Sequence, residues 1–171
     1  MTDKPLEGKT ALVTGSARNI GRATAHWLAG SGADIVVNAV SDADAAEAVA
    51  QEIREMGRKA IVCMADVTDK AAVDAMAARA REELGGVDIL ILNASSRAQV
   101  PFLEITPEQW RRVIDISIDG AFYPSQACIP HMMEKGWGRI VTMGGVAWHV
   151  GAADRVHSLV SKSGLAGFTH G

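Results

Sequence analysis

Five short apolar segments recur along the chain, separated by segments of mixed composition. Each apolar segment is nearly continuous in Val, Ile and Leu, without the alternation of a half-buried strand. Such runs are typical of strands that are buried on both faces of a parallel sheet. We therefore predict strands at residues 10–14, 34–40, 59–65, 87–94 and 138–143.

The segments between the first four runs carry helix signals. One follows a glycine turn, another has apolar residues at three- and four-residue steps, and a third is rich in Ala, Arg and Glu. Helices are therefore predicted over residues 20–29, 42–56 and 69–84.

A long helix is predicted after the fourth run. The sequence TPEQ, residues 106–109, offers a Thr cap, a Pro at the first helical position and a Gln three residues after the cap. We expect Pro124 and Pro130 to bend the helix that begins there, because proline cannot complete the helical hydrogen bonds.

Strands that alternate with helices predict right-handed βαβ units and a doubly wound parallel α/β sheet. No linker or repeat divides the sequence, so we expect residues 1–171 to form a single domain. An open sheet of this type usually has a sixth strand, whereas this sequence ends inside its fifth helical segment. We therefore expect a domain that is cut short after its fifth strand and helix.

The overall composition narrows the class of protein. The 171 residues are 48% hydrophobic, enough to build a core, and the net charge of −3 leaves basic residues scattered. We therefore expect neither nucleic acid nor a membrane as a partner. Cys63 and Cys128 form no C-x-x-C pair, no His/Cys cluster has metal-ligand spacing, and the first residues lack the apolar stretch of a signal peptide. These features predict a cytoplasmic protein without a metal.

The first predicted strand is followed by TGSARNIGRA, residues 14–23, a glycine turn that leads into a helix. Backbone N–H groups and the dipole of a helix N-terminus can hold a pyrophosphate at such a turn. Two glycines six residues apart are weak evidence alone. Four later segments strengthen the match: DVTD (66–69), LNAS (92–95), EITPEQWRRVIDISIDGAF (104–122) and SLVSKSGLAG (158–167).

From Lys9 to its end, the sequence resembles the short-chain dehydrogenase/reductase family, in particular its β-ketoacyl-carrier-protein reductase branch. The turn resembles the family's T-G-x-x-x-G-I-G motif, and the last segment resembles its Y-x-x-x-K-x-G motif. The resemblance implies a Rossmann-type fold, a nicotinamide dinucleotide cofactor and a carbonyl or alcohol substrate. It also implies a homo-oligomer that pairs through two long helices, here about residues 107–135 and 152–171.

The resemblance assigns cofactor contacts to the glycine turn, to the ends of three strands and to a lysine. Asp66 takes the position beside the adenine. Asn19 stands where the family has glycine, and we expect it to adopt a positive φ at a cost of about 1 kcal/mol. The implied contacts are Gly15, Ser16, Arg18, Asn19, Ile20, Gly21, Asn38, Ser41, Asp66, Val67, Asn93, Ala94 and Lys162.

The second predicted strand favours NADP(H) over NAD(H). An NAD site usually carries Asp or Glu at the end of this strand, but here Asn38 and Ser41 precede the first carboxylate, Asp42. Arg18 stands where similar family members place an arginine against the 2′-phosphate, which a guanidinium suits by charge and geometry. The alternative is a solvated Arg18 and an Asn38 that only ends a strand.

Most of the catalytic groups that the family uses are replaced. Lys162 is present, but Ser158 stands at the position of the tyrosine that moves the proton. Gly145 stands at the position of the serine that polarises the carbonyl, and Ser117 at that of the helix asparagine. An alkyl hydroxyl is a poor general acid–base at neutral pH, so we expect family catalysis to be severely impaired.

Other residues offer substitutes for the missing groups. His149 and Asp154 lie on the substrate side and are either general acid–bases or solvated loop residues. Ser158 and Lys162 are four apart on one helix face and form either a nucleophilic pair or the remnant of a dehydrogenase site. Further polar residues, Ser96 and Arg97, follow the fourth strand and either line a pocket or belong to a polar loop.

Three functions therefore stay open from the sequence. The first is an NADP(H)-dependent oxidoreductase that acts on a carbonyl or alcohol. The second is a pseudoenzyme that binds a dinucleotide or a partner without turnover. The third is a non-redox lyase or hydrolase that reuses the pocket, because a fold by itself does not determine a function.

Overall fold

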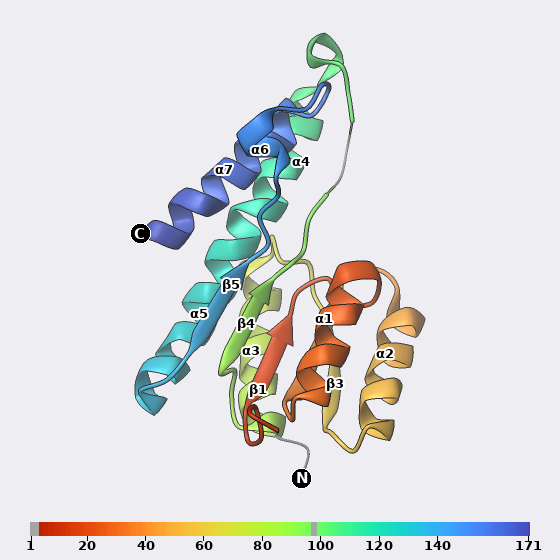
Figure 1. Ribbon diagram of the computed structural model, residues 1–171, viewed down its shortest axis with the longest axis vertical. Coiled ribbons are helices and arrows are strands. Elements are labelled where there is room, and N and C mark those ends of the chain that lie inside the picture. Colours follow the sequence, from red (N-terminus) through yellow and green to blue (C-terminus); the bar gives the residue numbers. More distant parts are fainter. Residues whose placement is uncertain (1–3, 97–98) are drawn as a thin grey trace.

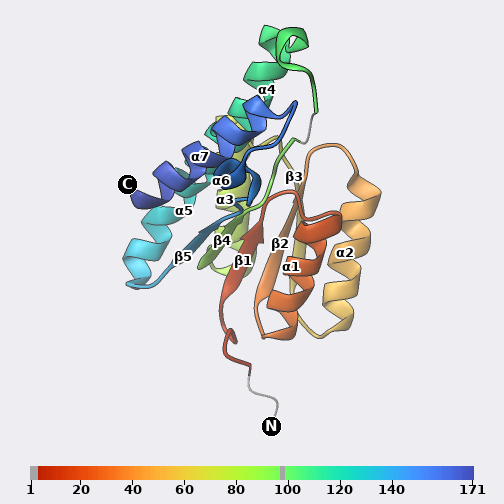
Figure 2. The same ribbon diagram turned by 45° about the horizontal axis from the view of Figure 1, so that its top comes forward.

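The computed structural model describes residues 4–96 and 99–171. Its strands are β1 (Thr10–Val13), β2 (Asp34–Ala39), β3 (Ala60–Met64), β4 (Ile89–Leu92) and β5 (Arg139–Thr142). They form one parallel sheet in the order β3-β2-β1-β4-β5 (Figure 1, and with all five strands labelled in Figure 2). The strand order reverses between β1 and β4, as a doubly wound sheet requires. The predicted fold class is therefore confirmed.

Helices cover both faces of this sheet (Figure 2). They are α1 (Asn19–Gly30), α2 (Ala43–Glu55), α3 (Lys70–Leu84), α4 (Pro107–Ser117), α5 (Asp119–Lys135), α6 (Ala147–Val150) and α7 (Val156–His170), with a short 3₁₀ helix, η1 (Phe102–Glu104). One core cluster joins the strands to α1 and α2, and the other joins them to α3, α5 and α7. Residues at the carboxyl ends of β1 to β4 line a cavity between the helices.

The central strands are largely buried as predicted, whereas the edge strands β3 and, above all, β5 are not fully buried. Every residue of β1 and β4 is buried. No residue of β5 is buried, and Val141 is 44% exposed. In the described part of the chain β5 pairs with β4 alone, so it is an edge strand with one uncovered side. Full burial of all five strands is therefore a wrong prediction.

The long helix begins as predicted but is interrupted. The Thr106 hydroxyl accepts a hydrogen bond from the Gln109 N–H (3.2 Å), and the Gln109 side chain accepts one from the Thr106 N–H (3.0 Å), which confirms the capping box. The break lies at Ile118, between α4 and α5, six residues before the first proline. Pro124 and Pro130 lie inside α5, so the prolines do not mark the interruption.

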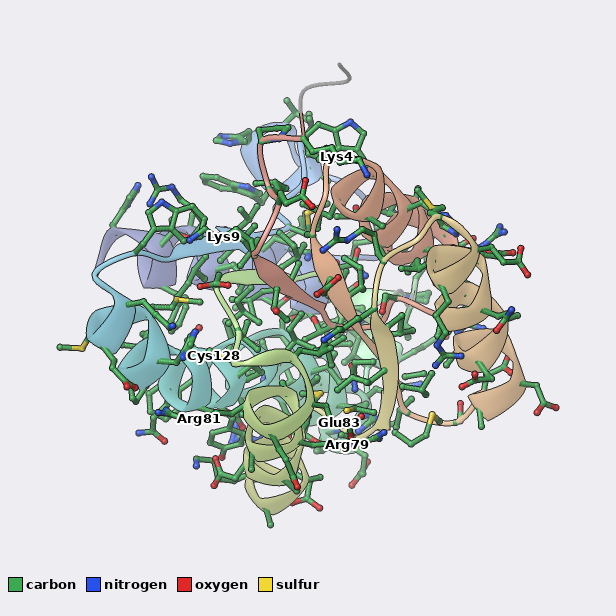
Figure 3. All side chains as sticks on the ribbon, turned by 90° about the horizontal axis from the view of Figure 1, so that it is seen from below. Lys4, Lys9, Arg79, Arg81, Glu83 and Cys128 are labelled. Atoms are coloured by element: carbon green, nitrogen blue, oxygen red, sulfur yellow. The ribbon has the colours of Figure 1, made fainter. Side chains whose placement is uncertain are left out.

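Both cysteines are buried free thiols. Cys128 lies on α5 beside α3 (Figure 3), and burial raises the pKa of its thiol to about 12. Burial likewise raises the pKa of Cys63. Among the described residues, no helix has the length and apolar character that a membrane crossing requires.

Gly21 allows α1 to pack closely on the turn that precedes it. A Cβ added at Gly21 would lie 2.3 Å from the carbonyl oxygen of Gly15 and 2.7 Å from the side-chain nitrogen of Asn93. Both of these neighbours are held by other contacts, so they cannot move freely aside. Gly30, at the other end of α1, has only the end of the Met56 side chain within contact distance, at 3.6 Å.

We expect Gly21→Ala to lower the free energy of unfolding by about 1–3 kcal/mol, because the new methyl group overpacks rigid backbone. Gly30→Ala is the matched control on the same helix, and it should leave stability unchanged or raise it by up to about 1 kcal/mol. Urea unfolding of the two variants measures the difference. Equal stabilities would contradict the close approach at Gly21.

Candidate functional site

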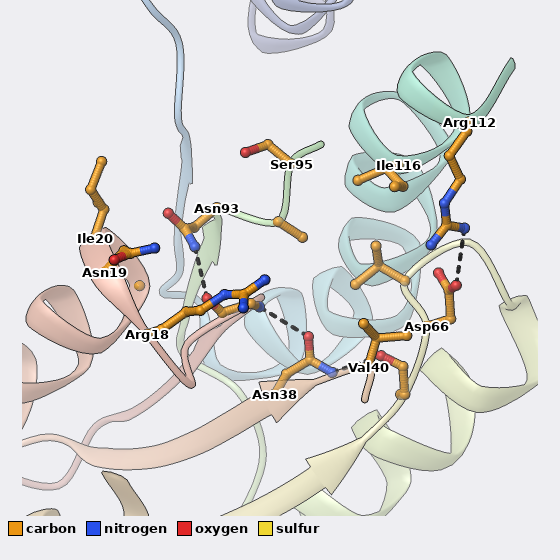
Figure 4. Close-up of a pocket in the computed structure, with 15 residues that line it drawn as sticks. Arg18, Asn19, Ile20, Asn38, Val40, Asp66, Asn93, Ser95, Arg112 and Ile116 are labelled. Carbon is orange, nitrogen blue, oxygen red and sulfur yellow. Dashed lines mark hydrogen bonds and ion pairs between the residues drawn. The ribbon is translucent and has the colours of Figure 1, made fainter. Parts of the chain in front are cut away.

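A cavity of about 730 Å³ opens at the carboxyl ends of β1 to β4 (Figure 4). Its walls come from the β1–α1 turn, from the ends of β2, β3 and β4, and from α4. This position matches the general rule that open α/β sheets bind ligands where the strand order reverses. The lining residues are Gly15, Arg18, Asn19, Ile20, Gly21, Asn38, Val40, Ala65, Asp66, Val67, Asn93, Ala94, Ser95, Arg112 and Ile116.

The β1–α1 turn presents backbone to this cavity. Gly15 has φ +64°, and Asn19 has φ +50°, as predicted for the position where the family has glycine. Arg18 caps α1 without a side-chain hydrogen bond, so the first N–H groups of this 12-residue helix have no side-chain acceptor at the cap. Such an N-terminus favours an anion at the cavity.

Asn38 ties the turn to two strands. Its side-chain oxygen accepts a hydrogen bond from the Gly15 N–H (3.1 Å), and its side-chain nitrogen donates to the carbonyl oxygens of Cys63 (3.1 Å) and Ala65 (3.0 Å). Asn38 is 2% exposed. The amide oxygen of Asn38 therefore holds the turn, and its amide nitrogen holds the end of β3. Asn38 also lines the cavity, and its contact with a cofactor stays a prediction.

Asn93 and Thr14 hold the turn from the other side. The Asn93 side-chain nitrogen donates to the carbonyl oxygens of Thr14 (2.9 Å) and Gly15 (3.1 Å). The Thr14 hydroxyl accepts from the N–H groups of Asn93 (2.9 Å) and Ala94 (3.0 Å). These hydrogen bonds fix the end of β4 against the turn.

Asp66 carries the negative charge of the cavity wall, and two neighbours share it. One carboxylate oxygen accepts from the Thr68 N–H (2.9 Å) and hydroxyl (2.8 Å), and the other from the Arg112 guanidinium (3.2 Å). Partial burial acts to raise the pKa of Asp66, but the hydrogen bonds from Thr68 and Arg112 outweigh burial and lower it. Asp66 is therefore ionised at neutral pH.

Three residues predicted at the cofactor do not line the cavity. Ser16 is fully buried, and its hydroxyl accepts from the Asn38 N–H (3.0 Å). Ser41 is exposed beside the start of α2. Lys162 lies on α7 and is not among the lining residues. Of the polar residues predicted after the fourth strand, Arg97 lies outside the described residues.

The predicted cofactor contacts did not include five lining residues: Val40, Ala65, Ser95, Arg112 and Ile116. The first two directly follow the ends of β2 and β3, so their place in a parallel sheet was a usable signal. Arg112 and Ile116 are four apart on α4, and only the packing of that helix brings them to the cavity.

The model of the short chain dehydrogenase family matches residues 9–171. The chain belongs to the short-chain dehydrogenase family. It is 38% identical over 166 residues to the D-beta-hydroxybutyrate dehydrogenase of Cupriavidus necator, and 36% identical over 164 residues to the 3-oxoacyl-(acyl-carrier-protein) reductase FabG of Escherichia coli. A solved Sinorhizobium meliloti structure, titled as a short-chain alcohol dehydrogenase, matches with a TM-score of 0.91 at 34% identity.

These alignments cover 96% of this chain. They cover 63% of the hydroxybutyrate dehydrogenase, 66% of the reductase and 65% of the S. meliloti chain. The chain thus spans just under two thirds of the length of these short-chain dehydrogenase relatives.

The positions that the resemblance assigns to catalysis lie on α4, on α7 and after β5. The Lys162 ammonium donates to the backbone oxygen of Met143 (2.5 Å), which directly follows β5. Ser158 lies one turn earlier on α7. Gly145 is exposed, and Ser117 is buried at the last residue of α4, beside the helix break. None of these four positions lines the described cavity, so their catalytic roles stay predictions.

Three other polar residues near α7 differ in surroundings. His157 is fully buried, and neither of its ring nitrogens has a hydrogen-bond partner among the described residues. The ring of His149 stacks on Trp148, with centroids 3.5 Å apart. Asp154 is exposed and has φ +58°. None of the three lines the described cavity.

We expect Asn38→Ala to lower the free energy of unfolding by about 2–4 kcal/mol, because it leaves one N–H and two carbonyl groups without their partner. Ser41→Ala, three residues away and exposed, should change stability by less than about 0.5 kcal/mol. Thermal and urea unfolding compare the two variants with the parent chain. An Asn38→Ala variant as stable as Ser41→Ala would show that the amide does not hold the turn.

Proposed function

We propose that the chain is the dinucleotide-binding part of an NADP(H)-dependent oxidoreductase acting on a carbonyl or alcohol, with an impaired proton-transfer site. The observation that carries this proposal is the turn at Gly15, which exposes backbone and a helix N-terminus to a large cavity. In this family fold, a nicotinamide dinucleotide supplies or accepts a hydride. The residues present fit the binding of such a dinucleotide better than they fit the proton transfer that accompanies hydride transfer.

The cavity offers a defined place to each half of a dinucleotide. The N-terminus of α1 suits the pyrophosphate. The ends of β2 and β3 suit the adenosine half, because the ribose partner of such sites lies at the end of the second strand. The ends of β4 and β5, where Ala94 and Lys162 lie, remain for the nicotinamide half. The absence of side chains at Gly15 and Gly21 supports this placement, since a Cβ at either would contact the Asn93–Ala94 segment.

Preference for NADP(H) is supported by charge at the adenosine end. The lining residues at the end of β2 are Asn38, whose amide is engaged, and the apolar Val40, so no carboxylate faces a ribose 2′-substituent there. Arg18 approaches the cavity from the β1–α1 turn, opposite α4 (Figure 4). A guanidinium there would pair with a 2′-phosphate.

We expect Arg18→Ala to weaken NADPH binding by about 10- to 100-fold, the scale of one lost charge-assisted contact, and to leave NADH binding nearly unchanged. Fluorescence titration with each reduced dinucleotide measures the two affinities. A parent chain that binds both equally, or a preference that survives Arg18→Ala, would refute the assignment of Arg18.

The groups near Lys162 support binding more than proton transfer. At the positions aligned with the family's donors, Gly145 has no hydroxyl and Ser158 has only an alkyl hydroxyl. Lys162 donates to a backbone oxygen, a contact that holds its ammonium at the end of β5. These features favour a second candidate, a dinucleotide-binding pseudoenzyme without turnover.

Restoring the missing donors separates the two candidates. A Cβ at Gly145 would meet no heavy atom within 4 Å, so a serine fits there. We expect the parent chain to reduce ketones and β-ketoacyl thioesters at least ~10³-fold more slowly than an intact family member. Gly145→Ser with Ser158→Tyr should recover more activity than the two single changes combined, because such groups act as a unit.

The rate of NADPH oxidation measures this recovery, and Lys162→Ala in the restored background is the control that should abolish it. Rapid turnover by the parent chain that survives Lys162→Ala would place the chemistry elsewhere. Such a result would overturn the proposed impairment of the site.

The self-association implied by the family stays part of the proposal. Phe122, Ile129 and Met133 are 46%, 39% and 75% exposed, and their spacing places them on one face of α5. An uncovered apolar face on a long helix supports pairing through that helix. A sedimentation coefficient of a monomer at all concentrations would exclude it.

A further inference from the structure

Arg112 is the one cavity-lining cation that no motif accounts for among the described residues. It lies on α4, and its guanidinium contacts Asp66 at one side of the cavity (Figure 4). The side chains of Arg112 and Asp66 are 52% and 30% exposed. An ion pair this exposed contributes little to stability, so stability alone does not account for its place at the site.

The topology indicates which part of a ligand Arg112 faces. Asp66 and Val67 directly follow β3, and Val40 directly follows β2. These strand ends are on the adenosine side of the reversal in strand order. Arg112 and Ile116 form the opposite wall, one helical turn apart on α4. A planar base placed at the adenosine end therefore lies between apolar strand ends and the α4 wall.

The surroundings of Arg112 orient it for contact with such a base. Thr68 holds one oxygen of Asp66, which leaves the other oxygen for the guanidinium. A guanidinium held by one edge keeps its planar faces available, and these faces stack on aromatic rings. Ile116 extends the same wall with an apolar surface.

We propose that Arg112 binds the adenine ring of the dinucleotide by stacking its guanidinium on the ring face, with Asp66 as its positioning residue. This inference rests on the proposed function and adds a specificity-determining residue to it. Arg112 thereby selects ligands with a planar base at the adenosine end.

The test uses equilibrium binding of NADPH and of adenosine 2′,5′-bisphosphate, which contains the adenine and the 2′-phosphate but no nicotinamide. Four proteins are compared: the parent chain, Arg112→Ala, Arg112→Lys and Arg111→Ala. Arg111 is the neighbouring exposed arginine on α4 and does not line the cavity, so its variant removes the same charge from the same helix. The urea midpoint of each variant reports whether the fold is intact.

Arg112→Ala should weaken binding of both ligands by the same factor, about 5- to 20-fold, because the lost contact is in their shared adenosine half. Arg112→Lys should stay weak, since an ammonium retains the charge but has no planar face. Arg111→Ala should bind like the parent chain, and all four urea midpoints should agree.

Recovery of affinity in Arg112→Lys would overturn the stacking contact and assign Arg112 to a phosphate. Unchanged affinity in Arg112→Ala, or an equal loss in Arg111→Ala, would also overturn the inference while leaving the proposed function intact, because the parent chain still binds NADPH. A parent chain that binds neither ligand would refute the proposed function and this inference together.

Discussion

The peptide backbone of Gly15 is held from both sides, and the geometry of the site depends on this. Asn38 accepts the Gly15 N–H, and Asn93 donates to the Gly15 carbonyl oxygen, each at 3.1 Å. These two amides come from β2 and from the end of β4, so three neighbouring strand ends are locked around one turn. Gly21 then lets α1 approach the same turn, which points the helix N-terminus at the cavity.

This arrangement divides the carboxyl edge of the sheet into two unlike parts. At β1 to β4 the side chains of Asn38 and Asn93 hold the turn, and Arg18 and Arg112 line the cavity. At β5 no residue of the strand is buried, and the resemblance assigns Gly145 and Ser158 to the positions of the family's proton donors. A short-chain dehydrogenase needs both parts for turnover, whereas dinucleotide binding needs mainly the first. The proposed function follows from this difference.

Structural features that depend on a few neighbouring residues could be predicted from the sequence. The apolar runs predicted the strands, TPEQ predicted the cap of α4, and the place of Asn19 in the turn predicted its positive φ. Each of these features depends on residues close together in the chain, whose spacing determines which side chains lie near one another. The fold class followed because these local elements alternate regularly.

The parts that could not be predicted depend on contacts distant in sequence. Asn38, near the end of β2, was predicted as a cofactor contact, but nothing in the sequence indicated its hydrogen-bond partners, which lie 23 to 27 residues away in the turn and at β3. Arg112 meets Asp66 across 46 residues. The exposure of β5 depends on what lies beside it in the sheet, and the break at Ile118 carries no proline or glycine of its own.

We propose that this chain has the residues that bind a dinucleotide but lacks the side chains that transfer the proton. The most direct measurement follows NADPH fluorescence as the intact chain is titrated, and then adds a β-ketoacyl thioester to the same sample. The account predicts a saturable binding signal that afterwards stays constant, because bound NADPH is not oxidised at an appreciable rate. The absence of saturable binding, or rapid loss of NADPH once the thioester is added, would contradict it.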